Sequence, residues 1–442
     1  MKMKNLLLSA VVLLGVCAGA VEYDLEVKTD KKHWALKAGE KVTFSFVLRS
    51  RENKKSPFTV VKNRKVTYEI MGDGGMKNIK KQFLTGEKPF TVTSSINGPG
   101  WLCINFIVRE ANGKPTFITQ GKKKVMLQKG IGVLYDPEKI QPGQPEPKDF
   151  DAFWKAQRQL LDKVPLKAKL TSISAPARYK GFNFWDVQID CAGGKPVSGY
   201  LCIPANAEPQ TLPAIVTYHG AGVRSSLMYP CGNAIHLDVN AHGIPNGKPL
   251  SFYENLKKTT LKDYRFAGMQ NRETVYFKGM FLRVMRALDY VKSRAEWNGK
   301  VLVVSGGSQG GGQAIAAAAL DPQVTLCVAG VPAIGDHAGS LAKFPRRPGW
   351  PKFYDARRSK PDQKVVDATA YFDNIFFAKR IKCEIYLTTG LMDMSCSPAG
   401  VYLVYRNTAS KKKDLAVFPT GNHGGAPNRK GSARISAVLQ GK

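Results

Sequence analysis

Acidic residues are scarce in this chain. Its 442 residues include 34 Asp and Glu against 66 Lys and Arg, so the formal net charge at pH 7 is +32. The basic residues are spread along the whole chain, whereas a nucleic-acid-binding element gathers them in a stripe or patch. We therefore expect no nucleic-acid partner. The excess charge instead favours attraction to an acidic glycan or an anionic envelope.

Paired cysteines and clusters of metal ligands are also missing. One of the eight cysteines, Cys17, lies in the leading segment, and the remaining odd number is scattered without close pairs. This spacing argues against a disulfide framework and against a zinc cluster. His219 and His236 could serve as metal ligands, but no carboxylate or cysteine falls at ligand spacing with them, so buried packing is the better interpretation. We predict no metal and no cofactor.

Long apolar runs are confined to the N-terminus. Residues 1–20 combine Lys2 and Lys4, an apolar stretch and a closing Ala18-Gly19-Ala20. This is the pattern of a cleaved secretory signal peptide. No later run is long enough to cross a bilayer. We therefore predict an exported protein, periplasmic or extracellular, without a membrane span.

Residues 21–130 lack any helical pattern. They form short runs of alternating apolar and polar residues, such as Lys41–Leu48 and Trp101–Val108, separated by turn residues. Alternation with period two predicts a small antiparallel β-sandwich of the immunoglobulin-like kind. We expect an accessory domain there, either a glycan-binding module or a spacer. Residues 131–147 are rich in proline and predict a stiff linker.

From residue 148 onward, strand and helix patterns alternate. A helix with an apolar stripe is predicted from about Lys148, and two strands separated by Gly193-Gly194 predict a hairpin. Continuous apolar runs follow, with a long periodic helix at Thr274–Arg294 between them. An antiparallel start followed by buried strands and helices predicts an α/β sheet with helices on both faces over residues 148–442.

One stretch of that sheet carries chemistry. The aliphatic run Val301–Val304 predicts a buried strand, and the alanine-rich run Ala314–Leu320 predicts a helix. Between them, Gly306, Ser308 and Gly310 have the G-x-S-x-G spacing of a nucleophile elbow, the strand–turn–helix feature of α/β-hydrolases. Small flanking residues permit the sharp turn, and the helix N-terminus favours negative charge beside the serine. The catalytic domain is therefore predicted to be an α/β-hydrolase.

A serine at its ordinary pKa is a weak nucleophile, so Ser308 needs a base, and the base needs an orienting carboxylate. In α/β-hydrolases the order along the chain is Ser, acid, His. Asp393 follows the predicted strand at Cys383–Leu387, and His423 follows the strand that ends at Phe418. We predict Asp393 as the acid and His423 as the base.

Other residues compete for these roles or complete the site. Asp336 and His337 begin a long irregular segment, and they could equally lie on the substrate side or at the surface. An oxyanion needs two N–H donors, one from the residue after the nucleophile and one from a loop after an earlier strand. Gln309 supplies the first. The turn at 218–222 follows a buried strand, and its Ala221 amide is the predicted second donor.

Several motifs occur together in one order and resemble the acetyl xylan esterase and cephalosporin C deacetylase family. The resemblance covers about residues 135–423 and rests on these motifs: Asp149–Trp154, Tyr276–Gly279, Gly306–Gly311, Tyr371–Asn374, Gly390–Asp393 and the turn at His423. It implies an α/β-hydrolase esterase whose catalytic triad is Ser308, Asp393 and His423, with an oxyanion hole formed by the amides of Ala221 and Gln309.

The chain departs from that family in three places. Ala221 stands where the family often has a tyrosine, which leaves the amide donor intact but changes a side chain near the acetyl pocket. The segment Pro245–Asn271 does not align with the family. The N-terminal β domain lies outside the family core, so an oligomer is possible but the family's ring-like hexamer is not implied.

Together these features predict a secreted serine esterase that removes O-acetyl groups from xylan or xylo-oligosaccharides through an acetyl-enzyme intermediate. The predicted partner is an acetylated oligo- or polysaccharide, and the positive charge favours an acidic xylan. Two alternatives stay open. One is an exported serine peptidase of the α/β-hydrolase type, which shares the Ser-Asp-His order. The other is an inactive glycan-binding protein that kept the fold.

Overall fold

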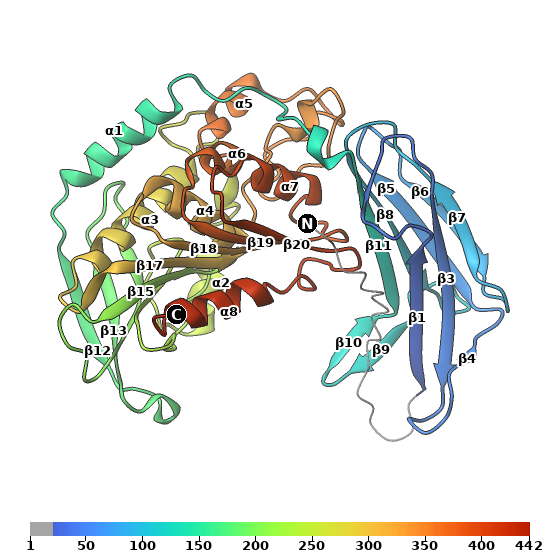
Figure 1. The fold of residues 1–442 in the computed structure, drawn as a ribbon, viewed down its shortest axis with the longest axis horizontal. Coiled ribbons are helices and arrows are strands. Elements are labelled where there is room, and N and C mark those ends of the chain that lie inside the picture. Colours follow the sequence, from blue (N-terminus) through green and yellow to red (C-terminus); the bar gives the residue numbers. More distant parts are fainter. Residues whose placement is uncertain (1–20) are drawn as a thin grey trace. The chain divides into compact units, whose positions relative to one another are not determined.

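The computed structural model describes residues 21–442, so the predicted signal peptide at 1–20 lies outside the described residues. The chain divides into two compact units, and the division falls between Asp136 and Pro137 (Figure 1). Each unit has its own sheets and its own buried core. The two units are therefore described separately.

The first unit is built from β-strands arranged in two main sheets and a small hairpin. In β3 (Val42–Arg51) alternate residues are buried, as the period-two pattern predicts. Phe46 of β3 stacks on Phe106 at 4.7 Å between ring centroids, which joins the cores of the two sheets. Nearly all the pairings are antiparallel; the short β2 pairs in parallel with β11. The other strands are β1 (Glu22–Thr29), β2 (Ala35–Leu36), β4 (Thr59–Val60), β5 (Lys65–Gly72), β6 (Ile79–Leu84), β7 (Phe90–Ser94), β8 (Gly100–Val108), β9 (Phe117–Gln120), β10 (Lys123–Met126) and β11 (Gln128–Tyr135).

The predicted linker at 131–147 is wrong at its start. Residues up to Tyr135 belong to β11, which pairs with β8 along its whole length. The proline-rich part that follows is anchored to the second unit rather than extended in solvent. The backbone carbonyl of Gln141 accepts a 2.8 Å hydrogen bond from the buried Arg346, and Glu146 forms ion pairs with Lys379 and Arg380. Proline composition alone did not reveal these partners, because they come from residues about 200 positions away.

The second unit contains one sheet of nine strands in the order β12-β13-β14-β16-β15-β17-β18-β19-β20. The pairings from β12 to β16 are antiparallel, and those from β16 through β15 to β20 are parallel. This confirms the predicted hairpin and antiparallel start. The strands are β12 (Ala168–Ile173), β13 (Phe182–Ile189), β14 (Val197–Pro204), β15 (Leu212–Tyr218), β16 (Ile235–Val239), β17 (Trp297–Gly307), β18 (Leu326–Gly330), β19 (Glu384–Gly390) and β20 (Lys413–Phe418).

Helices cover both faces of this sheet, as predicted (Figure 1). Helix α4 packs on β17 and β18 from one side together with α3, and α8 packs on β18 and β19 from the other. The face under α8 is sealed by an apolar cluster that includes Ile215, Val303 and Leu439. The helices are α1 (Phe150–Asp162), α2 (Leu250–Lys258), α3 (Tyr276–Lys292), α4 (Gln309–Leu320), α5 (Gln363–Ala370), α6 (Asn374–Phe377), α7 (Pro398–Asn407) and α8 (Arg429–Val438). Because strands β16 through β20 run in parallel, the residues that follow their carboxyl ends lie along one edge of the sheet.

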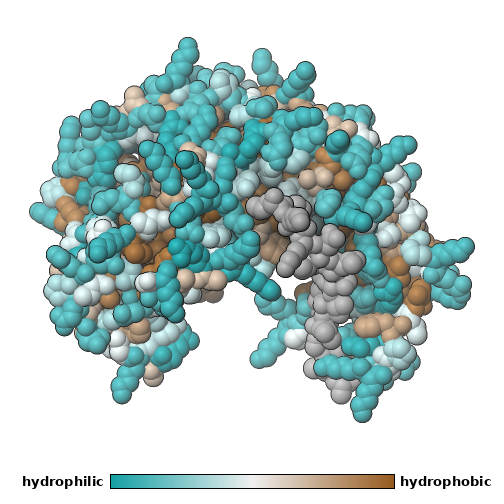
Figure 2. All heavy atoms as spheres, viewed as in Figure 1, coloured by the Kyte–Doolittle hydropathy of each residue, from teal (hydrophilic) through white to brown (hydrophobic). Residues whose placement is uncertain are grey.

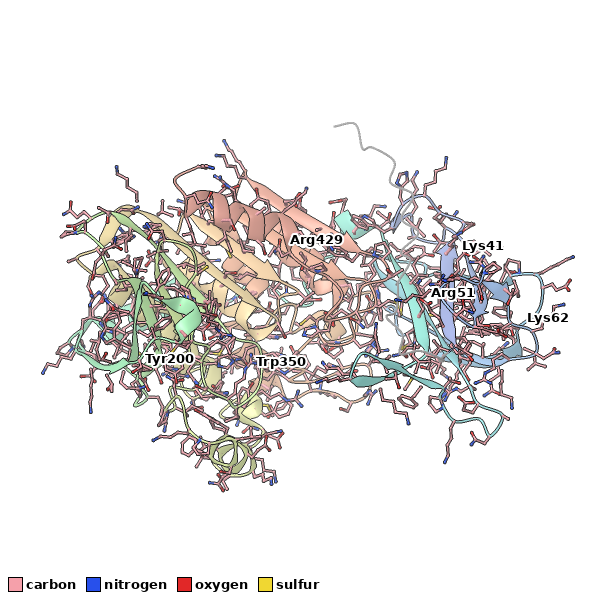
Figure 3. All side chains as sticks on the ribbon, turned by 90° about the horizontal axis from the view of Figure 1, so that it is seen from below. Lys41, Arg51, Lys62, Tyr200, Trp350 and Arg429 are labelled. Atoms are coloured by element: carbon pink, nitrogen blue, oxygen red, sulfur yellow. The ribbon has the colours of Figure 1, made fainter. Side chains whose placement is uncertain are left out.

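The surface carries the excess charge. Hydrophilic residues cover most of the face in Figure 2, and apolar residues appear there only in separate patches. Exposed basic side chains occur on both units, such as Lys41 and Lys62 on the first and Arg429 on the second (Figure 3). Among residues 21–442, every helix is too short or too polar to span a bilayer.

Candidate active site

Ser308 lies in a sharp turn between β17 and α4. Its backbone has φ 57° and ψ −123°, a conformation that costs energy for a residue with a side chain. Two close approaches explain the flanking glycines. A Cβ on Gly310 would lie 2.0 Å from the carbonyl oxygen of Tyr218, and one on Gly306 would lie 2.4 Å from the carbonyl carbon of Gly310. The turn is held by a 2.9 Å hydrogen bond from the Ser308 amide to the carbonyl of Gly330.

His423 follows β20 and lies between Ser308 and Asp393. Its Nε2 is 3.0 Å from Ser308 Oγ, and its Nδ1 is 2.8 Å from Asp393 Oδ2. The hydrogen bond with Asp393 raises the pKa of His423 above its ordinary value, against the opposing effect of partial burial. The side chain of His423 is 37% exposed, whereas that of Asp393 is 1% exposed. The structure therefore brings together the three residues that the sequence predicted as nucleophile, base and acid.

Asp393 is held in one orientation. It follows β19, and its Oδ1 accepts hydrogen bonds from the backbone amides of Ser395 at 2.7 Å and Cys396 at 2.9 Å. Its other oxygen faces His423. The acid loop and the histidine loop are tied by a 2.9 Å hydrogen bond from the amide of Met392 to the carbonyl of Gly421. A carboxylate fixed in this way can keep the proton of neutral His423 on Nδ1 and leave Nε2 free to accept the serine proton.

The competing residues Asp336 and His337 are engaged elsewhere. The carboxylate of Asp336 accepts two hydrogen bonds of 2.7 Å from the guanidinium of Arg346, and both side chains are 1% exposed. The backbone amide of His337 donates to Asp373, and burial lowers the pKa of His337 to about 3. A histidine that stays neutral in a closed core is a packing residue here.

The loop that carries Ala221 lies beside Ser308. A Cβ on Gly220 would lie 3.8 Å from Ser308 Cβ, so the backbone of this loop passes next to the serine. His219 holds the loop through two hydrogen bonds. Its Nδ1 donates to the carbonyl of Gly220 at 2.7 Å, and its Nε2 accepts from the amide of Ala241 at 3.2 Å. Burial lowers the pKa of His219 to about 4, so the ring stays neutral and keeps this arrangement.

Sequence reasoning missed a group of ring side chains that supports the site. The hydroxyl of Tyr264 donates to Gln309 Oε1 at 2.7 Å. His242 Nε2 donates to the carbonyl of Gly222 at 3.0 Å, and Tyr276 approaches His242 Nδ1 at 2.6 Å. Tyr276 lies in one of the motifs that carry the family resemblance. Tyr264 lies in the segment that does not align with that family, so no sequence signal marked it.

The acid–histidine pair also forms part of a possible ligand cluster. One atom each of Asp393, Cys396 and His423 lie within 4.8 Å of one another. The cluster fits a metal poorly. Asp393 and His423 already bond to each other, and burial raises the pKa of the Cys396 thiol, whereas metals bind the thiolate. His236 donates from Nδ1 to the carbonyl of Tyr229 at 2.8 Å, in agreement with a packing role.

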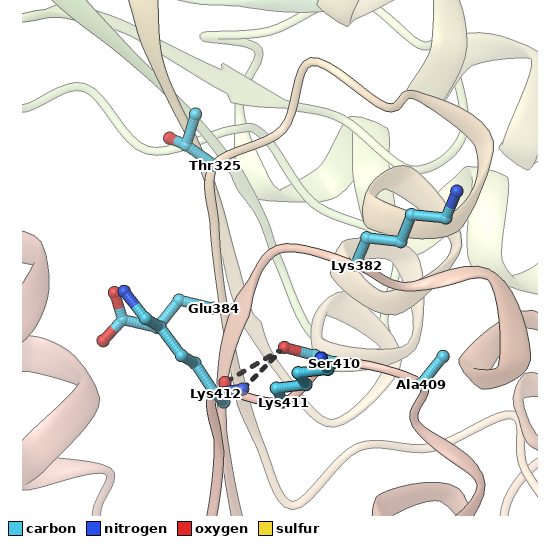
Figure 4. Close-up of a pocket in the computed structure, with 7 residues that line it drawn as sticks. All are labelled: Thr325, Lys382, Glu384, Ala409, Ser410, Lys411 and Lys412. Atoms are coloured by element: carbon cyan, nitrogen blue, oxygen red, sulfur yellow. Dashed lines mark hydrogen bonds between the residues drawn. The ribbon is translucent and has the colours of Figure 1, made fainter.

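A surface hollow lies at the opposite end of the strands (Figure 4). The hollow is lined by residues that come just before β18, β19 and β20, namely Thr325, Lys382 and Lys412. The candidate site residues Ser308, Asp393 and His423 instead follow the carboxyl ends of strands. Two hydrogen bonds between Ser410 and Lys412, of 3.1 and 3.3 Å, shape one wall. This hollow is therefore separate from the candidate active site.

Comparisons with known proteins place the chain in a family. Residues 134–436 match the family described as acetyl xylan esterase (AXE1). The chain is 30% identical over 444 residues to the acetyl esterase Axe7A of Xylanibacter ruminicola, a match that covers 96% of this chain and 93% of that protein. That relative is therefore similar over both units, including the first.

Solved structures support the same conclusion for the second unit. The acetyl xylan esterase from Paenibacillus sp. R4 is 25% identical, with a TM-score of 0.56, and the match covers 69% of this chain and 98% of that one. Acetyl xylan esterase 1 from Thermoanaerobacterium sp. JW/SL YS485 shares the fold at 23% identity, with a TM-score of 0.56 and coverage of 69% and 97%. The predicted α/β-hydrolase fold and family resemblance are both confirmed. The chain belongs to the acetyl xylan esterase family and is a carboxylic ester hydrolase.

Proposed function

We propose that this protein is an exported serine esterase that removes O-acetyl groups from xylan or xylo-oligosaccharides. The observation that carries the proposal is the continuous line of hydrogen bonds from Ser308 Oγ through His423 to the buried Asp393. This line ends at a serine in a strained turn at the start of α4, beside the loop that carries Ala221. Such an arrangement is suited to acyl transfer through a covalent intermediate.

In the proposed mechanism Ser308 Oγ attacks the acetyl carbonyl carbon while His423 Nε2 takes the hydroxyl proton. The carbonyl oxygen becomes negatively charged and receives hydrogen bonds from the amides of Ala221 and Gln309. When the tetrahedral intermediate collapses, the bond to the sugar oxygen breaks and His423 returns the proton to that oxygen. Water then attacks the acetyl group on Ser308 with the same proton transfers, and acetate leaves.

The charge near the site supports an acidic glycan as the substrate. Lys352 donates to the carbonyl of Met394 at 3.2 Å, directly next to Asp393 in the chain. Partial burial lowers the pKa of Lys352, and the positive charges of Arg347 and Arg265 lower it further. A uronic acid side group of xylan would neutralise this concentration of positive charge.

The first unit is proposed to be an accessory module that binds glycan or spaces the esterase from a surface. The relative Axe7A is similar over this unit as well, which favours a role connected with the esterase. The signal-peptide pattern of residues 1–20 and the excess of basic residues both support the proposal that the protein is exported.

Acetate release from a panel of acetylated glycans tests the proposal. We expect acetylated xylan to be hydrolysed by the parent and not by Ser308→Ala. Hydrolysis of dipeptides but not of acetylated sugars would favour the alternative of an exported peptidase. A fluorophosphonate probe should label the parent covalently and leave Ser308→Ala unlabelled; a parent that resists labelling would favour the inactive glycan-binding protein.

A further inference from the structure

The connection between β16 and α3 contributes a side chain to the centre of the site. This connection contains α2 and a short turn of helix at Tyr264–Phe266. Tyr264 makes edge-to-face contact with His242 at 4.6 Å between ring centroids, and its ring centroid lies 4.8 Å from that of Tyr276. The Tyr264 ring is thereby held by two packed rings, one from the same connection and one from the first residue of α3.

The side chain of Tyr264 links the two segments that carry the predicted oxyanion donors, one directly and the other through His242. Its hydroxyl donates to Gln309 Oε1 at 2.7 Å. Its ring also packs on His242, whose Nε2 donates to the carbonyl of Gly222, the residue after Ala221, at 3.0 Å. Burial raises the pKa of Tyr264 to about 12, so the proton is present throughout the range in which an esterase works.

The side chain of Gln309 depends on this contact. Gln309 is fully buried, and within residues 21–442 its amide nitrogen has no hydrogen-bond partner. Without the hydroxyl of Tyr264, neither the oxygen nor the nitrogen of this buried amide would have a hydrogen-bond partner among the described residues. The orientation of the side chain would then no longer be fixed by a hydrogen bond. Gln309 is the first residue of α4, and its backbone amide is the proposed oxyanion donor, so a fixed side chain here also helps to fix that amide.

We propose that Tyr264 is a positioning residue that sets the spacing of the oxyanion hole by joining Gln309 to the loop of Ala221. This inference rests on the proposed function, since it takes the amides of Ala221 and Gln309 as the oxyanion donors. Tyr264 does not contact the reacting atoms itself. Its effect should therefore appear in the stabilisation of the transition state rather than in the binding of the substrate.

Tyr264→Phe in the full chain tests the inference, because phenylalanine keeps the ring contacts and removes only the hydroxyl. With an aryl acetate as substrate, we expect kcat to fall by about 10- to 100-fold while KM stays within about twofold. The matched control is Tyr253→Phe in the same connection. Tyr253 is buried, and among residues 21–442 its hydroxyl bonds only to the nearby backbone of Pro245 and Lys248, so its loss should leave kcat unchanged.

A double-mutant cycle separates positioning from a general structural effect. Gln309→Met keeps the backbone amide and removes the acceptor of the Tyr264 hydroxyl, so it should lower kcat by a similar factor. The double variant should then lose little more than either single variant, because both remove one contact. Binding of a boronic acid that mimics the tetrahedral intermediate should weaken in parallel with kcat/KM.

The outcomes divide clearly. The inference is overturned if Tyr264→Phe keeps kcat within twofold of the parent, if the two losses multiply, or if Tyr253→Phe falls equally. The same holds if only KM changes. A parent chain that hydrolyses no acetyl ester would instead contradict the proposed function, so the two failures are distinguishable. Thermal unfolding of each variant shows whether a fall in kcat accompanies loss of the folded state.

Discussion

Replacing Asp393 with asparagine changes the site with almost no change in shape. The side-chain oxygen of asparagine can still accept from the amides of Ser395 and Cys396, which hold Asp393 Oδ1 at 2.7 and 2.9 Å. Its NH₂ group then points at His423 Nδ1. An NH₂ group can only donate, so Nδ1 must become the acceptor and the ring proton must move to Nε2. In that tautomer His423 cannot take the proton of Ser308.

The size of the effect follows from the burial of the pair. Asp393 is 1% exposed, so water cannot substitute for the lost carboxylate. Forcing the wrong tautomer in a serine–histidine–acid triad costs about four orders of magnitude in kcat, or about 5 kcal/mol of transition-state stabilisation. We expect Asp393→Asn to show a loss of this size, with KM for an aryl acetate nearly unchanged.

The pH dependence supplies a second measurement. In the parent, Asp393 raises the pKa of His423, and activity should fall as the pH drops through that raised pKa because protonated His423 cannot act as a base. In Asp393→Asn the pKa of His423 falls, so the acid limb of the residual activity should move to lower pH. Initial rates between about pH 4 and about pH 9 measure the acid limb of the parent and that of the variant.

A matched control is Asp414→Asn. Asp414 lies at the amino end of β20, the strand that leads to the histidine loop, and its partly exposed carboxylate pairs with the exposed Lys430. This variant should keep parental kcat, since surface ion pairs contribute little. The reasoning is refuted if Asp393→Asn keeps kcat within tenfold of the parent while still folded, or if its acid limb moves to higher pH.

Three further predictions concern stability, charge and domain structure. Arg346→Met leaves the buried carboxylate of Asp336 without its guanidinium, so it should lower the free energy of unfolding by about 3–5 kcal/mol in a denaturant titration; an unchanged midpoint would contradict this. Raising the salt concentration from about 0.1 M to about 1 M shortens the screening length from about 10 Å to about 3 Å. KM for acetylated glucuronoxylan should therefore rise while KM for a neutral aryl acetate stays constant, and an equal response of both substrates would exclude substrate capture by the positive surface. A chain that begins at Pro137 should fold and hydrolyse aryl acetates, because the second unit has its own core; an insoluble product would show that the first unit is required.

Much of the fold could be predicted because its signals are local. The alternation in β3, the hairpin of β13 and β14, and the strand–turn–helix pattern around Ser308 each depend on neighbouring residues. Backbone geometry and periodic burial act over a few positions, so a short window of sequence contains the information. The order Ser308, Asp393, His423 was also predictable, since the three residues directly follow predicted strands or the tight turns after them.

Other decisions required contacts between distant residues. The choice between Asp393 and Asp336 depends on which carboxylate meets a histidine and which meets Arg346, and both are single aspartates in irregular segments. The end of the first unit is set by the pairing of β11 with β8. The proline-rich composition after residue 136 gives no sign of that pairing.

Tyr264 shows the limit most clearly. By itself the sequence predicted the α/β-hydrolase sheet, the candidate nucleophile and the candidate base, because a glycine-flanked serine between strand and helix and a single late histidine leave little choice. Only the tertiary structure decided that the Tyr264 hydroxyl meets Gln309 at 2.7 Å, a contact between residues 45 positions apart. The physical reason is that side-chain hydrogen bonds across a fold depend on the packing of whole elements, which no local pattern specifies.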